Sequence, residues 1–364
     1  MFTSPHKGLL LLEDGTIFEG SGFGAEALAT GEICFTTSMA GYYETLTDPS
    51  YSHQLVLFTH THIGNYGVKE SEEKESERIH AKGFICRNFS TIFSRSNAKS
   101  LQSLLEQYQI PVISDIDTRA LVQKIRKEGA MNGLLTTQKN PDIQELKEKL
   151  QNTPSMKGLF LTPHVSTPKT YEIPVSSPQY KIAVIDYGVK QNILNELTKR
   201  SVALKVFPHH ATYEEIMSYS PDGVMLTNGP GDPEAMKNEV VVIQKLLENN
   251  VPIFGICLGH QLLAIAAGCK TIKMHHGHRG CNHPVKNLTN GKCEITSQNH
   301  GFTVDNNHLS ENVEVTHINL NDHSIEGIRI LNKKAFSVQY HPESCPGPHD
   351  SKYLFEQFLD IMKN

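Results

Sequence analysis

The sequence has no long apolar run, no closely paired cysteines and no excess of positive charge. No apolar stretch among its 364 residues approaches the length of a membrane-spanning helix, and the N-terminal leucine run is too short for a signal sequence. The net charge is −5 with acidic and basic residues interspersed, which argues against nucleic acid as a partner. The sequence therefore predicts a cytoplasmic protein that binds neither membranes nor nucleic acid.

The seven cysteines are odd in number and form no C-x-x-C pair. This pattern argues against a disulfide framework or a zinc ribbon and favours free thiols in a reducing compartment. The chain also lacks the G-x-x-x-x-G-K-[ST] phosphate loop, so nothing in it indicates ATP chemistry. Each cysteine is expected to be an ordinary small hydrophobe unless its surroundings argue otherwise.

The composition divides the chain into three parts. Residues 1–152 contain short strand-like runs and one amphipathic helix, which we expect to be capped by Asp117 or Thr118 with Leu121 and Ile125 on its apolar face. Residues 153–178 are rich in proline and predict a linker. In residues 179–364 strands alternate with helices. The expected fold is α/β, with a doubly wound, mostly parallel C-terminal sheet and a separate N-terminal α/β domain.

A cysteine stands between two glycines where an apolar strand meets a helix, in G-I-C-L-G. Gly255 and Gly259 permit a tight turn that lifts Cys257 clear of the sheet. The N-terminus of the helix, expected near His260, favours a thiolate there, and its amides can stabilise an oxyanion. The motif predicts a nucleophile, although a buried structural cysteine at a helix start fits the same pattern.

A base and its orienting group occur together in AFSVQYHPES, on the last predicted strand. Side chains alternate along a strand, which places His341 and Glu343 on one face. His341 could then present one ring nitrogen to Cys257 while Glu343 holds the other. A chain with 19 histidines forms such a pair easily by chance. Together with the cysteine turn in one domain, the pair predicts a catalytic triad.

Three motifs in this order resemble the triad-type, class I glutamine amidotransferases: NGPGDP, GICLGHQLLA and HPE. Five longer stretches resemble the small, glutaminase subunit of carbamoyl-phosphate synthase, and they cover essentially the whole chain: GEICFTTSMAGYYETLTDPSYSHQLVLFTHTHIGNYGV, DTRALVQKIRKEGAMNG, DYGVKQNIL, GHRGCNHPVKN and SQNHGFTVD. The likeness is specific because other amidotransferases of this class lack the first domain. It implies the glutaminase subunit of a glutamine-hydrolysing carbamoyl-phosphate synthase.

The resemblance also implies roles for individual residues. Cys257 would be the nucleophile, His341 the general base and then acid, and Glu343 the orienting carboxylate. The residues that would bind the oxyanion or the substrate glutamine are Leu258, Gly229, Gly231, Gln261, Asn299, Gly301, Phe302 and, from the first domain, Ser50. Arg279 and Cys281 depart from the family's GHHGGNHP pattern, which puts only local loop details in doubt.

The resemblance further implies a large synthetase subunit as partner. That subunit would bind ATP, magnesium and bicarbonate and receive ammonia through an internal passage, for arginine and pyrimidine synthesis, while this chain would hold no cofactor and no metal. Three other functions stay open: service to another synthase such as anthranilate synthase, an inactive binding module of the same fold, and a free-standing γ-glutamyl hydrolase.

Two further patterns are expected to be structural. The cluster of His275, His276, His278, Cys281 and His283 matches no known zinc spacing. The stretch GSGFGA at residues 20–25 lacks the following helix and the acidic partner of a dinucleotide-binding fingerprint, so we expect a hairpin turn there.

Overall fold

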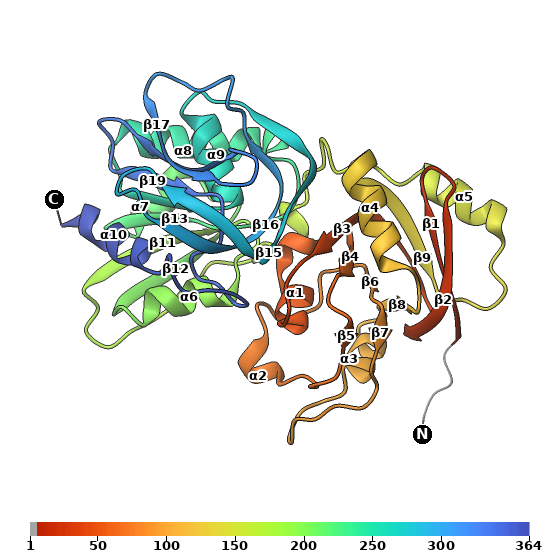
Figure 1. Ribbon diagram of the computed structural model, residues 1–364. Coiled ribbons are helices and arrows are strands. Elements are labelled where there is room, and N and C mark those ends of the chain that lie inside the picture. The colour runs from red at the N-terminus through yellow and green to blue at the C-terminus, as the bar shows by residue number, and fades with distance from the viewer. Residues whose placement is uncertain (1–5, 364) are drawn as a thin grey trace. The chain divides into compact units, whose positions relative to one another are not determined.

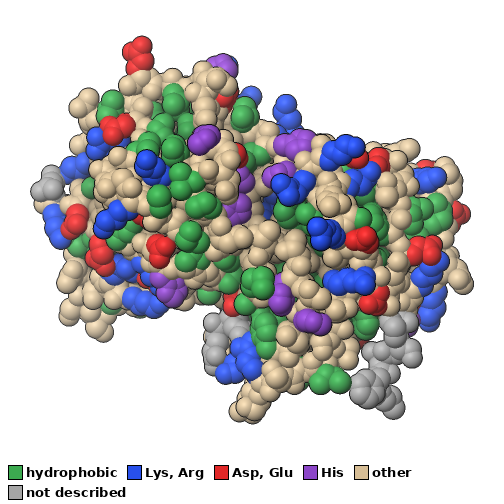
Figure 2. Space-filling model, in the orientation of Figure 1, with side chains coloured by type: hydrophobic (Ala, Val, Ile, Leu, Met, Phe, Trp, Pro, Cys, Tyr) green, Lys and Arg blue, Asp and Glu red, His purple; other side chains and the backbone are tan. Residues whose placement is uncertain are grey.

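The computed structural model describes residues 6–363, except for the side chains of residues 72 and 73, and it divides into two units (Figure 1). The N-terminal unit runs to Met156 and includes His275–Arg279. The C-terminal unit takes Lys157–Met274 and the chain from Gly280 onward. Within residues 6–363, no helix combines the length and the apolar character needed to cross a membrane. Charged side chains of both signs are interspersed over the face shown in Figure 2.

The N-terminal unit is built on a closed barrel with the strand order β1-β2-β8-β6-β4-β3-β9. Its strands are β1 His6–Leu12, β2 Ile17–Gly24, β3 Leu28–Thr36, β4 Gln54–Phe58, β6 Gly83–Ile85, β8 Pro111–Ser114 and β9 Met131–Thr136, and β5 His62–Ile63 pairs separately with β7 Asn88–Phe89. The helices are α1 Tyr42–Thr47, α2 Glu70–Glu73, α3 Leu101–Gln107, α4 Thr118–Glu128 and α5 Ile143–Gln151, with a 3-10 turn at Pro49–Tyr51. The sequence predicted strands and α4 here but gave no sign that the strands close into a barrel.

The leucine run of β1 shows how the barrel is packed. Alternate side chains of a strand point to opposite faces. Leu10 and Leu12 accordingly join the core cluster contributed by most of the barrel strands, and Leu9 and Leu11 pack with α5. The expected α4 is confirmed: the Asp117 carboxylate accepts the Ala120 N–H at 2.9 Å, and the apolar stripe is buried.

The stretch at residues 20–25 is not a hairpin turn, so that prediction was wrong. Residues 20–24 lie within β2, which pairs with both β1 and β8, and the turn between β1 and β2 precedes them. A Cβ on Gly20 would lie 2.1 Å from the Ser114 carbonyl oxygen, so this glycine allows β8 to approach.

The C-terminal unit contains one ten-stranded sheet with the order β10-β12-β11-β13-β14-β19-β18-β17-β15-β16. The parallel part comprises β11 Tyr180–Asp186, β12 Val202–Pro208, β13 Gly223–Leu226, β14 Ile253–Ile256 and β19 Ala335–Val338. The other strands are β10 Tyr171–Ile173, β15 Thr271–Asn287, β16 Cys293–Val304, β17 Val313–Asn319 and β18 Ile325–Ile330. Antiparallel pairing of β15, β17 and β18 extends the sheet beyond β19.

Helices cover both faces of this sheet (Figure 1). The helices are α6 Gln191–Thr198, α7 Tyr213–Ser218, α8 Lys237–Glu248, α9 Leu258–Ala266 and α10 Tyr353–Met362, with 3-10 turns at Thr162–His164 and Pro233–Ala235. One apolar core packs α8 and α9 against the strands, and a second packs α6 and α10 against the opposite face. This is the doubly wound arrangement that the alternation of strands and helices predicted.

We expected residues 153–178 to form a separate linker. The structure differs from this expectation. From Lys157 onward it belongs to the C-terminal unit, where β10 pairs antiparallel with β12. The Gly158 N–H donates to the Asp232 carboxylate at 2.7 Å, and the Asp232 N–H donates to the Leu159 carbonyl at 2.9 Å. Prolines prevent a helix here, but the remaining backbone groups still find partners on the sheet and its loops.

Candidate active site

Cys257 is the single residue between β14 and α9, and its backbone has φ 54° and ψ −103°. Positive φ is uncommon for a residue with a Cβ. A Cβ on Gly255 would lie 2.8 Å from the Gly259 carbonyl oxygen, and a Cβ on Gly259 would lie 2.3 Å from the Leu226 carbonyl oxygen. Both glycines are therefore required for the turn, and α9 begins at Leu258, earlier than expected.

The Cys257 side chain is buried at the start of α9, with an exposed fraction of 2%. Its Sγ donates to the Asn299 carbonyl at 3.6 Å. The exposed N–H groups at a helix N-terminus carry partial positive charge, which stabilises a sulfur anion in this position.

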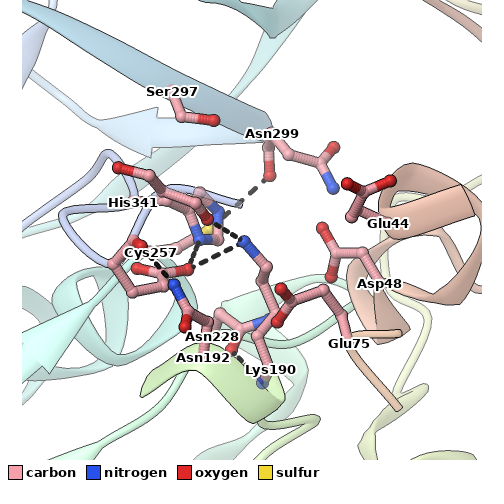
Figure 3. A network of polar contacts seen from close by, with 12 residues as sticks. Glu44, Asp48, Glu75, Lys190, Asn192, Asn228, Cys257, Ser297, Asn299 and His341 are labelled. Carbon is pink, nitrogen blue, oxygen red and sulfur yellow. Dashed lines mark hydrogen bonds and ion pairs between the residues drawn. The ribbon is translucent and has the colours of Figure 1, made fainter. Parts of the chain in front are cut away.

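His341 and Glu343 lie in the turn after β19, which ends at Val338, so strand alternation does not place them as predicted. Their side chains nevertheless meet: the ring Nδ1 of His341 is 2.7 Å from Oε1 of Glu343, and both residues are buried. Because an ionised carboxylate only accepts hydrogen bonds, Nδ1 carries the proton in this pair. Nε2 then remains for Cys257, and the His341 ring and the Cys257 thiol lie side by side (Figure 3).

Burial and neighbouring charges act in opposite directions on this pair. Burial lowers the pKa of His341, but the Glu343 carboxylate and the Cys257 sulfur outweigh it and raise that pKa. Burial raises the pKa of Glu343, but the positive charges of Lys190 and His341 outweigh burial and lower that pKa below its ordinary value. The carboxylate is therefore ionised at neutral pH, and the raised pKa of His341 favours the protonated, imidazolium form of the ring beside the sulfur.

Lys190 is a member of this site that the sequence analysis missed. Its Nζ lies 3.0 Å from Oε1 of Glu343 and donates to the Ser344 carbonyl at 2.7 Å, and both charged side chains are buried. The Asn192 side-chain amide holds the same turn by donating to the Glu343 carbonyl at 2.5 Å. One sequence signal was available: Lys190 follows the parallel strand β11, and ligands bind beyond the carboxyl ends of such strands.

The two residues expected to bind the oxyanion adjoin one another. Leu258 is the first residue of α9, so its N–H has no carbonyl partner one turn earlier in the helix. A Cβ on Gly229 would lie 2.8 Å from Cδ2 of Leu258 and 2.2 Å from the Tyr187 carbonyl oxygen, so only glycine fits at position 229. Gly231 follows in the same loop with φ 99°, against the backbone of Leu159 and Leu161.

Most of the residues expected to bind glutamine come from α9 and β16. Gln261 Nε2 donates to the Phe302 carbonyl at 2.9 Å. Asn299, whose carbonyl contacts Cys257, lies on the same strand as Gly301 and Phe302. Ser50 lies in the 3-10 turn of the N-terminal unit, where its N–H donates to the Asp48 carboxylate at 2.9 Å. The approach of Ser50 to glutamine stays a prediction.

Three side chains of the histidine- and cysteine-rich cluster, which we expected to be structural, form hydrogen bonds with backbone carbonyls. His275 Nε2 lies 3.2 Å from the Arg126 carbonyl oxygen and His276 Nδ1 lies 3.0 Å from that of Gly277, both within the N-terminal unit. Cys281 Sγ donates to the Pro346 carbonyl at 3.2 Å in the C-terminal unit. These contacts support structural roles for the three residues.

The turn, the thiol and the buried histidine–glutamate pair on a doubly wound sheet define a class I glutamine amidotransferase domain. The family model described as glutamine amidotransferase class-I matches residues 183–361, in agreement with this geometry. A second model, described as carbamoyl-phosphate synthase small chain, CPSase domain, matches residues 10–135. The two models therefore fall on the two units.

Curated relatives match over nearly the full chain. The carbamoyl phosphate synthase small chain of Pectobacterium atrosepticum is 45% identical, over 98% of this chain and 97% of its own. The small chains of Buchnera aphidicola and Escherichia coli K12 are 45% and 43% identical, over 97% and 98% of this chain and 95% and 97% of their own. The chain belongs to the family of carbamoyl phosphate synthase small chains. Membership in this family argues against service to anthranilate synthase.

Proposed function

We propose that this chain hydrolyses L-glutamine at Cys257 and supplies the ammonia to the large subunit of a carbamoyl-phosphate synthase. The observation that carries the proposal is the geometry at the end of β14. A thiol sits at a strained turn on a helix N-terminus, beside an imidazole whose other nitrogen is held by Glu343. A cysteine kept only for packing needs neither the positive φ nor the buried imidazole.

In the first half of the reaction Nε2 of His341 takes the proton of the Cys257 thiol, and the resulting thiolate attacks the side-chain carbonyl carbon of glutamine. The carbonyl oxygen becomes an oxyanion, which the N–H groups of Leu258 and Gly229 are suited to bind. One such donor typically contributes about 3 kcal/mol of transition-state stabilisation. His341 then gives its Nε2 proton to the departing nitrogen, ammonia leaves, and a γ-glutamyl thioester remains on Cys257.

In the second half, water replaces ammonia and the same groups act in reverse. His341 takes a proton from the water, the oxygen attacks the thioester carbon, and the thiolate leaves. One glutamine and one water thus give one glutamate and one ammonia. Lys190 and the turn around Glu343 keep the carboxylate ionised throughout, so the imidazolium formed in each half is stabilised.

The remaining sequence predictions complete the proposal. Gly231, Gln261, Asn299, Gly301 and Phe302 would bind the substrate, with Ser50 contributed by the N-terminal unit. The large subunit would bind ATP, magnesium and bicarbonate, and its product would enter arginine and pyrimidine synthesis. Passage of ammonia inside the complex would keep it from protonation by water. The cytoplasmic location and the absence of a cofactor from this chain stay predictions.

The decisive test is covalent labelling. The chain, assembled with its synthetase partner, is incubated with a glutamine-analogue electrophile, and the modified peptide is identified by mass spectrometry. We expect one adduct on Cys257 and protection by excess glutamine. Cys86, which is buried in the N-terminal unit, is the internal control and should stay unmodified. An unmodified Cys257 in the active complex would favour the binding-module alternative.

A further inference from the structure

Gln339 is a buried amide beside the proposed site that the mechanism above does not use. It follows β19 directly, two residues before His341, and its exposed fraction is 0%. Its Oε1 lies 3.0 Å from Nε2 of Gln261, a residue proposed to bind glutamine. The same Nε2 donates to the Phe302 carbonyl at 2.9 Å. Gln261 is therefore held from two sides by groups of the C-terminal unit.

The chemistry of these groups fixes which way each amide points. The Phe302 carbonyl can only accept, so Gln261 must turn its NH2 group toward it. An NH2 group has two hydrogens, and the second is directed at Gln339, which must then present its oxygen. Both donors of Gln261 are used within the protein. The carbonyl oxygen of Gln261 is its remaining recognition group, and it accepts hydrogen bonds only.

Both groups that hold Gln261 are themselves anchored. His300 Nδ1 lies 2.8 Å from the Phe302 carbonyl oxygen, so this oxygen is held by a second donor. The Gln339 backbone N–H donates to the Glu326 carbonyl at 2.9 Å, which continues the pairing of β19 with β18. The amide of Gln261 is thus fixed by partners on β16 and after β19.

The environment of Gln339 does not favour an amide for stability alone. Within residues 6–363 its Nε2 has no hydrogen-bond partner, although the side chain is buried. A buried donor without a partner is unfavourable, and an apolar side chain of the same length would avoid that cost. What an apolar side chain cannot supply is the oxygen that faces Gln261.

We propose that Gln339 is a positioning residue that orients the Gln261 carboxamide so that it offers only an acceptor oxygen to the substrate. This inference rests on the proposed function. It implies that the substrate group meeting Gln261 is a hydrogen-bond donor. Without Gln339, one of the two hydrogen bonds that hold the Gln261 NH2 group is lost, so the amide is less restrained in the orientation in which its oxygen meets a donor on glutamine.

The test is a double-mutant cycle measured on the assembled synthase. Gln339→Met removes the acceptor at nearly constant length. We expect the KM for glutamine to rise about tenfold, the equivalent of one hydrogen bond, with little change in kcat. In a Gln261→Ala background the same substitution should change the KM less than about twofold, because the group it orients is gone. Equal effects of Gln339→Met in both backgrounds would overturn the inference.

Two further variants separate positioning from general damage. Gln339→Glu keeps an acceptor oxygen in the same place and should recover most of the lost affinity; a KM as high as that of Gln339→Met would also overturn the inference. Gln102→Met is the matched control, because the Gln102 amide forms hydrogen bonds with the Gly24 backbone and with Glu106, all within the N-terminal unit. It should leave the KM unchanged.

Failure of the inference is distinguishable from failure of the proposed function. Iodoacetamide alkylates a reactive thiol without glutamine recognition, so its rate with Cys257 should be the same in the wild-type chain and in Gln339→Met. Synthesis from added ammonia should likewise be unchanged. If the wild-type synthase does not use glutamine at all, the proposed function fails. If it does and the cycle is additive, only the role of Gln339 fails.

Discussion

Two buried cysteines occupy equivalent places in the two units. Cys86 directly follows β6, and Cys257 directly follows β14, and each of these short strands is paired in parallel on both sides. Each cysteine N–H continues the ladder, Cys86 to the Ile113 carbonyl at 3.1 Å and Cys257 to the Val338 carbonyl at 2.9 Å. Their exposed fractions are 0% and 2%. Burial at a strand end therefore does not distinguish a nucleophile from a packing residue.

What distinguishes them is the chain that follows and the neighbour that faces the sulfur. No helix begins directly after Cys86, because β7 follows it instead. Burial raises the pKa of the Cys86 thiol, and the negative charge of Asp115 raises that pKa further. After Cys257 the chain turns at positive φ into α9, and an imidazole stands between the sulfur and Glu343. A carboxylate alone keeps a thiol protonated, whereas a carboxylate acting through an imidazole helps to remove the proton.

The largest expected effect tests the two cysteines directly. Cys257→Ala should lower glutamine-dependent carbamoyl phosphate synthesis by ~10³-fold or more while synthesis from added ammonia continues, because only the nucleophile is lost. Cys86→Ala should leave both activities near wild type and cost only packing stability. Assays of the assembled synthase with each nitrogen source measure both. Glutamine hydrolysis by the Cys257 variant would contradict the comparison.

The next effect concerns the carboxylate behind the base. Glu343→Gln keeps the shape of the buried turn but removes the charge that holds the His341 proton on Nδ1. We expect kcat for glutamine hydrolysis to fall by ~10²–10⁴-fold, as for carboxylates that orient a catalytic histidine elsewhere. The rate of Cys257 alkylation by iodoacetamide should fall as well. Asp115→Asn, the matched change near Cys86, should alter neither measurement.

The same substitution has a predicted signature in stability. The pKa of Glu343 is lowered from its ordinary value of 4.5 to about 2, so its contribution is present above pH 4.5 and is lost as the pH falls toward 2. The pKa of His341 is raised from 6.5, so its contribution is complete below pH 6.5 and is lost as the pH rises through the raised value. Urea midpoints should peak between pH 4.5 and 6.5, and Glu343→Gln should flatten that peak.

Local patterns predicted much of the geometry of the candidate site because that geometry depends on short segments. The turn around Cys257 needs glycine at fixed positions, and the histidine–glutamate pair is two residues apart, so both are readable in one sequence. Lys190 reaches the same carboxylate from 153 positions earlier in the chain, and no local spacing records that contact. The proposed role of Gln339 likewise depends on its hydrogen bond to Gln261 of α9, and its neighbours in sequence do not indicate that contact.

The fold was predictable to a similar extent and for the same reason. Alternation of strands and helices is a local signal, and it predicted the doubly wound C-terminal sheet. Closure of the barrel depends on pairing β1 with β9, whose residues are far apart in sequence. The glycines of β2 were assigned to a turn because composition alone does not show that Gly20 makes room for β8.

The smallest expected effect is a difference in stability between alanine substitutions at two glycines, Gly259 after Cys257 and Gly83 before Cys86. A Cβ on Gly259 would lie 2.3 Å from the Leu226 carbonyl oxygen, which belongs to a buried central strand and cannot move aside. A Cβ on Gly83 would lie 2.7 Å from Cδ2 of Leu55, the end of a side chain that can rotate. Gly259→Ala should therefore cost about 3 kcal/mol of stability and Gly83→Ala about 1 kcal/mol.

Urea unfolding of each variant measures this difference, and glutaminase activity shows whether it matters for the site. In Gly259→Ala the strain falls on the turn that holds Cys257, so activity should drop under conditions where the chain is still folded. Gly83→Ala should lose stability without losing activity, since Cys86 performs no chemistry. Equal costs for the two glycines would mean that the turn at Cys257 adapts as readily as an ordinary strand end, and its positive φ would then need a different explanation.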